Sequence, residues 1–321
     1  MSEKASFLRR TPKAATSRKT ISIADIRTGS RLILSLFVAW LLPERSWPFL
    51  ARHGSFIAGI LAGKTTKPVE ARMMRALGAD AATAARLAAD LRAARYEVAF
   101  QCLRGYRPGG WNPKIEIVGR EHIDAALKQG KGCVLWMAHF VFAPNVAKMG
   151  LHDLGFAVSH LSRPDHGFSS TRFGIRYLNF VRRRFEDRYL KERIVFDRAH
   201  PAGALKRARK ATAKNGIVSF TAGAWEGSSL VESRFMKSRA TFAMGPVWLA
   251  RASGAALLPV FATRTGKNGF LIEVDPPIDV QAASTEAECL VEATTSFLQR
   301  HEARIVKHPG QWRGWSSLRD D

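Results

Sequence analysis

The chain has 321 residues, of which 46% are hydrophobic and 10% aromatic, so its composition excludes an intrinsically disordered protein. It carries 50 Lys and Arg residues against 27 Asp and Glu, which gives a formal net charge of +23. The length allows one large domain, or a domain with a smaller appendage. An excess of positive charge of this size indicates an anionic partner, and nucleic acid, an acidic protein and an anionic membrane are the candidates.

The first 31 residues are predicted to form a basic tail, and an apolar run follows directly at 32–42. Eleven residues make a helix of about 16 Å, roughly half of the ~30 Å hydrocarbon core of a bilayer. A second apolar segment at 47–61 is interrupted by Arg52, His53 and Gly54. We therefore expect residues 32–62 to form an interfacial or re-entrant membrane anchor, with the tail in the cytoplasm. An amphipathic helix packed on the globular body is the alternative.

The same segment also has the order of charges found in a signal peptide, but the residues after the apolar run disfavour that interpretation. The chain continues there as Pro43-Glu44-Arg45, which contains no small-residue cleavage site. The basic region before the run is also too long. We expect an anchor that is not cleaved.

Residues 63–106 are rich in Ala, Leu and Arg and are predicted to form a helical preamble, in which Asp80 caps a long amphipathic helix. Residues 107–321 alternate short apolar strands with helices and are predicted to form one α/β domain, a mixed central sheet flanked by helices. The expected strands are 114–118, 133–137, 156–161, 193–196, 217–221, 257–263 and 270–274. The expected helices lie near 121–129, 144–153, 170–190, 201–214, 245–253 and 284–306.

The cysteines and histidines do not predict a metal site. Cys102, Cys133 and Cys289 lie far apart in the sequence, with no C-x-x-C spacing, so neither a disulfide framework nor a zinc cluster is expected. No pair of histidines stands four residues apart on a helix with an acidic partner.

His139 is the strongest candidate for chemistry. It follows the apolar strand at 133–137, and the carboxyl ends of strands are where open α/β sheets bind ligands. An imidazole at that edge suits a general base. A core histidine bonded to backbone is the alternative.

The segment 163–214 concentrates positive charge, with fifteen Lys and Arg against five Asp and Glu. Arginine binds phosphate oxygens through paired hydrogen bonds, so those near the strand ends suit a phosphorylated ligand, while most of the others are expected on a solvated helix face. The aromatic-interleaved basic motifs of RNA-binding modules are absent from the sequence, which disfavours nucleic acid as the partner.

Four stretches, 119–140, 161–168, 240–264 and 305–315, resemble the late lipid A acyltransferases, the lauroyl and myristoyl transferase branch of the lysophospholipid acyltransferase superfamily. The HPGQW near the carboxyl end is similar to the closing Pro-x-Gln-Trp signature of that family. The resemblance implies transfer of a fatty acyl group from a thioester of acyl carrier protein or coenzyme A to a hydroxyl of a glycolipid such as a lipid A precursor. It implies no further cofactor, and it places the protein on the cytoplasmic face of the inner membrane, with acyl carrier protein and anionic lipids as partners.

The resemblance also implies roles for individual residues. His139 matches the catalytic histidine, which removes a proton from the acceptor hydroxyl. Arg163, and one or more of Arg172, Arg176 and Arg182, fall where the family places arginines that bind phosphate and head groups.

One position departs from the family pattern, in which an acidic residue follows the histidine after four residues. That position here is Pro144, so the carboxylate that orients the imidazole is missing. Glu226 is the first substitute to consider, followed by Asp165 and Asp153. An unassisted histidine and a non-catalytic relative that only binds membrane lipid or acyl carrier protein are the other two readings.

Overall fold

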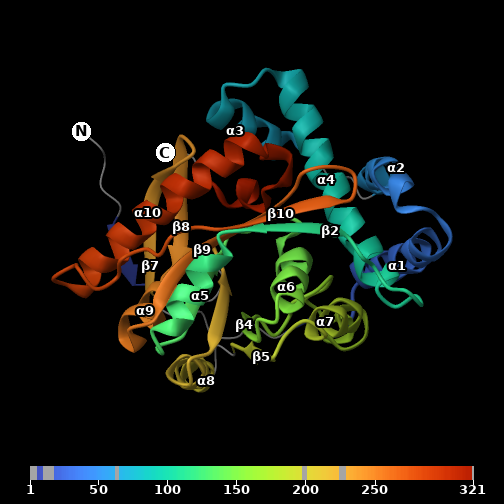
Figure 1. Cartoon of the computed structure of the whole chain (residues 1–321). Helices are drawn as coiled ribbons and strands as arrows, with labels where there is room; N and C mark the ends of the chain where they lie inside the picture. The colour runs from blue at the N-terminus through green and yellow to red at the C-terminus, as the bar shows by residue number, and fades with distance from the viewer. Residues whose placement is uncertain (1–5, 10–17, 62–64, 197–200, 224–228, 320–321) are drawn as a thin grey trace.

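The computed structural model describes residues 6–9, 18–61, 65–196, 201–223 and 229–319. Its centre is a seven-stranded mixed sheet in the order β2-β10-β9-β3-β6-β4-β5. Strands β9, β3, β6, β4 and β5 are parallel, whereas β10 runs antiparallel to β9 and pairs in parallel with β2. The predicted α/β class with a mixed sheet is therefore confirmed (Figure 1).

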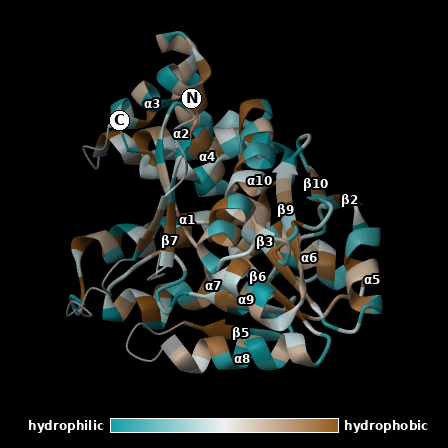
Figure 2. Ribbon diagram, turned by 90° about the vertical axis from the view of Figure 1, so that its left-hand side faces the viewer, coloured by the Kyte–Doolittle hydropathy of each residue, from teal (hydrophilic) through white to brown (hydrophobic). Residues whose placement is uncertain are grey.

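The seven expected strands all form, with shifts of one or two residues at their ends. Their bounds are β2 (Lys114–Val118), β3 (Cys133–Met137), β4 (Val158–Ser162), β5 (Glu192–Val195), β6 (Ile217–Thr221), β9 (Ala256–Arg264) and β10 (Gly269–Val274). All five residues of β3 are buried, as expected for a central parallel strand. The central strands are largely hydrophobic in Figure 2.

Helices cover both faces of this sheet. They are α5 (Arg120–Lys128), α6 (Ala143–Asp153), α7 (Asn179–Asp187), α8 (Pro201–Ala213), α9 (Gly245–Ser253) and α10 (Glu286–Lys307). Helix α9 contacts both α8 and α10, and α10 lies on the opposite side of β10 from α6 (Figure 1). The indole of Trp136 in β3 stacks on Phe297 of α10, with ring centroids 4.1 Å apart, so aromatic packing fixes α10 to the sheet.

Four helices precede the α/β domain: α1 (Ile23–Leu41), α2 (Trp47–Leu61), α3 (Lys67–Leu77) and α4 (Ala81–Arg104). Helices α1, α2 and α3 each pack against α4, whose first turn is capped by Asp80 as predicted. Helix α1 begins at Ile23, so the last nine residues of the range predicted as a tail are helical. In the described part of the chain, none of the helices combines the length and the hydropathy needed to cross a bilayer.

A second sheet was not predicted. It has the order β1-β7-β8 and consists of β1 (Ser6–Arg9), β7 (Ser229–Phe235) and β8 (Ser238–Ala243), all antiparallel. The β7–β8 turn consists of Met236 and Lys237, which both have positive φ angles, 53° and 52°. Such a two-residue turn usually contains Asn or Gly, so the sequence carries no ordinary signal for this hairpin.

Candidate active site

His139 lies in the loop between β3 and α6, at the edge where β3, β4 and β6 have their carboxyl ends. The N–H of Ala138 donates to the carbonyl oxygen of Val260 at 2.8 Å, so the start of this loop continues the sheet. Pro144, the second residue of α6, suits the first turn of a helix because it has no N–H to leave unpaired. The loop is therefore short and held at both ends.

The C-terminal segment fixes the rest of this loop through main-chain hydrogen bonds. The N–H of Val141 donates to Gln311 O at 2.8 Å, and the N–H of Arg313 donates to His139 O at 3.1 Å. Phe140 and Trp312 form the antiparallel bridge between the two segments. Residues about 170 positions apart in the sequence are thereby held side by side, and Arg313 lies next to His139.

Two cavities of about 540 Å³ each meet at His139. Cavity 1 is lined by the start of α1 and by the loop after β4, including Ser22, Thr28, Arg163, Ser170 and Arg182. Cavity 2 is lined by the small sheet and the C-terminal segment, including Arg9, Leu230, Phe242, His301, Trp312 and Ser316. Both cavities share His139, Gly223 and Arg313, so a ligand in either one reaches the same imidazole.

His139 is neutral at physiological pH. Burial, followed by the positive charges of Arg313, Arg182 and Arg95 and the nearby His166, holds its pKa well below 6.5. Burial and the repulsion of Arg182 and Arg95 also lower the pKa of Arg313 to about 9, which leaves this guanidinium charged at neutral pH. No carboxylate of the described residues forms an ion pair with Arg313. A free imidazole next to two guanidiniums is suited to accept a proton beside a bound anion.

Glu186 is fully buried and organises the cationic wall of cavity 1. Arg182 Nε donates to its carboxylate at 2.8 Å and Arg193 donates to it at 3.0 Å, while the buried ammonium of Lys148 forms a third ion pair. Burial alone would raise the pKa of Glu186, but His166, Lys148 and Arg182 hold it well below 4.5. Three cations around one carboxylate leave an excess of positive charge at this wall.

His166 connects Glu186 to the cavity. Its Nε2 lies 2.9 Å and 3.0 Å from the two carboxylate oxygens of Glu186. Burial lowers the pKa of His166 to about 4 in spite of that carboxylate, so the contact is a hydrogen bond from a neutral imidazole and not an ion pair at neutral pH. Since a carboxylate only accepts, Nε2 carries the proton.

The predicted arginines separate into two groups. Arg163 and Arg182 line cavity 1 with His139, and Arg163 forms a two-pronged ion pair with Asp165 at 2.8 Å and 2.9 Å. Arg172 and Arg176 line neither cavity. They lie on the exposed surface of the helical segment that includes the π-helical turn η2 (Gly174–Leu178), and this arrangement does not bring them to His139.

The three carboxylates considered as partners of His139 have different positions. Asp165 lines cavity 1, but its two oxygens are engaged by Arg163. Asp153 is exposed at the far end of α6, about three turns from His139, and contacts His152. Glu226 lies outside the described residues. Neither Asp165 nor Asp153 is therefore placed where it could orient the imidazole.

Helix α1 closes cavity 1 through one buried carboxylate. Asp25 accepts hydrogen bonds from Ser169 Oγ at 2.6 Å, Thr171 Oγ1 at 2.9 Å and the N–H of Ser22 at 2.7 Å. Burial alone would raise the pKa of Asp25, but these hydrogen bonds lower it below 3.8, so the carboxylate is charged and anchors α1 to the loop after β4. Cavity 1 therefore lies directly beneath α1.

Three functional residues were not predicted from the sequence. Arg313 belongs to the C-terminal stretch already singled out, but no spacing rule relates it to His139. Glu186 stands four residues after Arg182, which is the spacing of a helical ion pair and could have indicated their contact. His166 follows the Arg163-Pro164-Asp165 sequence, and nothing local to it indicates its contact with Glu186.

Comparisons with known proteins place the chain among acyltransferases. A family model described as bacterial lipid A biosynthesis acyltransferase matches residues 94–315. A comparison with curated proteins gives no match. Among solved structures, the chain is similar to the 1-acyl-sn-glycerophosphate (LPA) acyltransferase PlsC from Thermotoga maritima, at 13% sequence identity and a TM-score of 0.35, over 89% of this chain and 98% of that one.

Replacement of Glu186 by Gln is expected to lower the free energy of unfolding by about 3–5 kcal/mol, because it leaves three buried cations without their counter-ion. Urea denaturation followed by circular dichroism measures this loss. Asp187→Asn is the matched control, since Asp187 pairs with Arg193 while its side chain is 47% exposed. It should cost less than about 1 kcal/mol. An equal loss in the two variants would contradict the role given to Glu186.

Proposed function

Since the chain belongs to the bacterial lipid A biosynthesis acyltransferase family, we propose that it transfers a fatty acyl group from a thioester of acyl carrier protein or coenzyme A to a hydroxyl of a glycolipid such as a lipid A precursor. The observation that carries this proposal is the position of His139. It stands where two cavities meet, beside two guanidiniums, at the carboxyl edge of the sheet. One cavity for each substrate is what a transfer between two molecules requires.

In the proposed mechanism, neutral His139 removes the proton of the acceptor hydroxyl as its oxygen attacks the thioester carbonyl carbon. A carbon–oxygen bond forms and the carbonyl electron pair moves onto its oxygen. Collapse of this intermediate breaks the carbon–sulfur bond, and the leaving thiolate takes the proton back from His139. No covalent enzyme intermediate is needed.

Arg182 and Arg313 would supply the positive charge that this reaction needs. An anionic head group bound at the wall of cavity 1 would lie against guanidiniums that no other anion fully neutralises. Arg313 also lies next to His139, where negative charge develops on the carbonyl oxygen. We propose that Arg163 and Arg182 bind the phosphate or head group of the acceptor and that Arg313 stabilises the transition state.

Apolar side chains on α1 and α2 support a position at the membrane surface. Exposed large hydrophobic residues concentrate there: Ile23, Ile26, Ile33, Leu34, Phe37, Trp40 and Leu41 on α1, and Phe49, Phe56, Ile57 and Ile60 on α2. Phe173 and Tyr177 continue this apolar surface on the η2 segment, which contacts α1, and Arg172 and Arg176 lie beside them. We propose that this surface inserts into the cytoplasmic leaflet of the inner membrane, with the arginines at the anionic head groups.

Replacement of His139 by Ala is expected to lower the rate of acyl transfer by about 10²–10⁴, because the reaction loses its general base. The measurement is transfer from an acyl thioester to a lipid A precursor by the purified chain, with products identified by mass spectrometry. His152→Ala is the control, since this histidine is exposed on α6 and lines neither cavity. Retained activity in His139→Ala would sink the assignment, and a wild-type chain without transfer would favour the non-catalytic relative.

Membrane binding is tested by replacing Phe37 and Phe56 together with Ser. The two rings are 58% and 57% exposed, and the double variant should bind vesicles containing anionic phospholipid at least about tenfold more weakly in sedimentation. Val306→Ser changes an equally exposed apolar residue, 58%, on α10, away from α1 and α2, and should bind as the wild type does. Unchanged binding of the double variant would contradict the proposed surface.

A further inference from the structure

Cavity 2 has an exposed, basic entrance and an apolar interior. Arg9, Ser316, Ser317 and Arg319 line it and are exposed, so they mark its entrance. Leu230, Phe242 and Trp312 are buried and form its walls. His139 and Arg313 lie where it joins cavity 1. The cavity thus leads from solvent to the candidate base.

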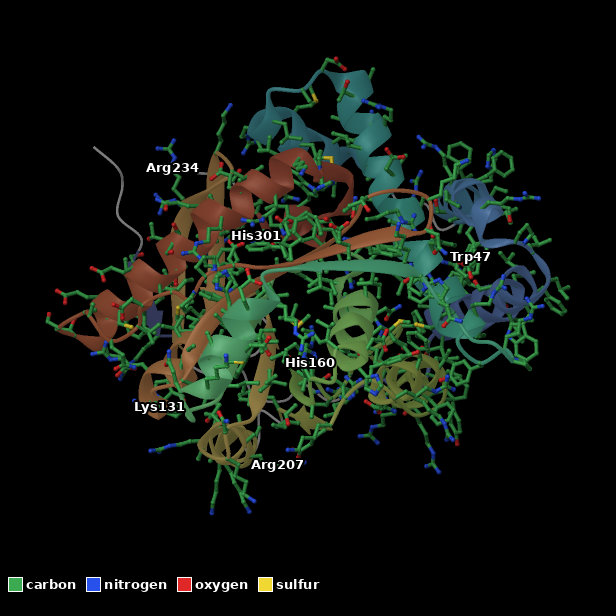
Figure 3. All side chains as sticks on the ribbon, viewed as in Figure 1. Trp47, Lys131, His160, Arg207, Arg234 and His301 are labelled. Carbon is green, nitrogen blue, oxygen red and sulfur yellow. The ribbon has the colours of Figure 1, made fainter. Side chains whose placement is uncertain are left out.

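His301 is the polar group of the inner wall, and its ring nitrogens have no hydrogen-bond partner among the described residues. The side chain is 1% exposed and is surrounded by aromatic rings, those of Phe140, Phe235, Phe261, Phe297 and Trp312. Figure 3 shows it beneath α10, on the other side of the sheet from His160. An unpaired buried polar group is costly and calls for an explanation, and a neutral imidazole can both donate and accept, as an amide requires.

The surface around the entrance of cavity 2 is strongly basic. Strands β1, β7 and β8 with their turn and the described end of the chain contribute Arg9, Arg234, Lys237, Arg239 and Arg319, and the one acidic residue among these segments is Glu232, which pairs with Arg319. Arg234 projects outward from the hairpin in Figure 3. This face lies on the opposite side of the molecule from α1 and α2 (Figure 1).

Resting on the proposed acyl transfer, we propose that cavity 2 binds the phosphopantetheine arm of the thioester donor, while cavity 1 binds the glycolipid acceptor. Such an arm carries a phosphate at one end, a hydroxyl and two amides along an otherwise apolar chain, and the thioester at the other end. The phosphate would meet Arg9 and Arg319, an amide would meet His301, and the thioester would reach His139. The acceptor enters from the side of α1, where the proposed membrane surface lies.

Charge and position both favour this assignment over the reverse. A carrier protein or coenzyme A comes from water and is anionic, which suits the basic face that is remote from α1 and α2. A glycolipid comes from the bilayer, and cavity 1 is the one walled by Ser22, Ala24 and Thr28 of the α1 region. The two substrates then meet from opposite sides at one imidazole.

The test uses two exposed serines, one lining each cavity, whose side chains make no hydrogen bond in the described structure. Ser316→Trp should obstruct cavity 2, and Ser170→Trp should obstruct cavity 1. Isothermal titration of the full chain with coenzyme A, an unreactive carrier of the arm, is expected to show at least a tenfold loss of affinity in Ser316→Trp and wild-type affinity in Ser170→Trp. His301→Phe, which keeps an aromatic ring and removes both nitrogens, should weaken binding about tenfold.

The outcomes separate this assignment from the proposed function. A loss of affinity in Ser170→Trp with none in Ser316→Trp would reverse the two cavities, and no change in either would overturn the assignment. A change in preferred acyl-chain length in Ser316→Trp without loss of coenzyme A affinity would make cavity 2 an acyl-chain site instead. A wild-type chain that binds neither coenzyme A nor holo-acyl carrier protein would also overturn it. Binding at cavity 2 without any acyl transfer by the wild type would contradict only the proposed function.

Discussion

The pairing of the His139 loop with the C-terminal segment determines the geometry of the whole site. Two main-chain hydrogen bonds join residues 139–141 to residues 311–313, and the side chain of Gln311 in turn binds both the N–H and the carbonyl oxygen of Arg264 at the end of β9. The indole N–H of Trp315 donates to Pro309 O at 2.8 Å and stiffens the segment itself. These contacts place Arg313 beside His139 and create the boundary at which the two cavities meet. They also give a structural reason for a Pro-x-Gln-Trp sequence near the carboxyl end.

The charges around His139 follow from that arrangement. In a triad, a carboxylate orients the histidine and raises its basicity. Here Pro144 stands at the position of that carboxylate, and the groups that act on the imidazole are the cations of Arg313, Arg182 and Arg95. Their field weakens His139 as a base in the free protein. A phosphate bound between Arg182 and Arg313 would offset this field, so we expect binding of an anionic acceptor to raise the pKa of His139 and to activate the base only when substrate is present.

The sequence predicted those parts of the structure whose signals are local. Seven strands were found because each is a short apolar run, and His139 was found because it follows the most apolar of them. The β7–β8 hairpin was missed because Met236 and Lys237 replace the usual turn residues. Arg313 and Glu186 were missed because their contacts with His139 and His166 join distant segments. Arg172 and Arg176 were expected at the site because of their charge, but they face outward beside exposed aromatic residues, and spacing alone could not reveal this orientation.

The most direct test of this account is an NMR titration of the His139 imidazole in the full chain, with and without inorganic phosphate or a phosphorylated glycolipid head group. The account predicts a pKa well below 6.5 in the free protein, which rises when the anion binds and does not rise in an Arg182→Gln variant. A pKa near 6.5 in the free protein that the anion leaves unchanged would contradict it, because the guanidiniums would then not control the proton of His139.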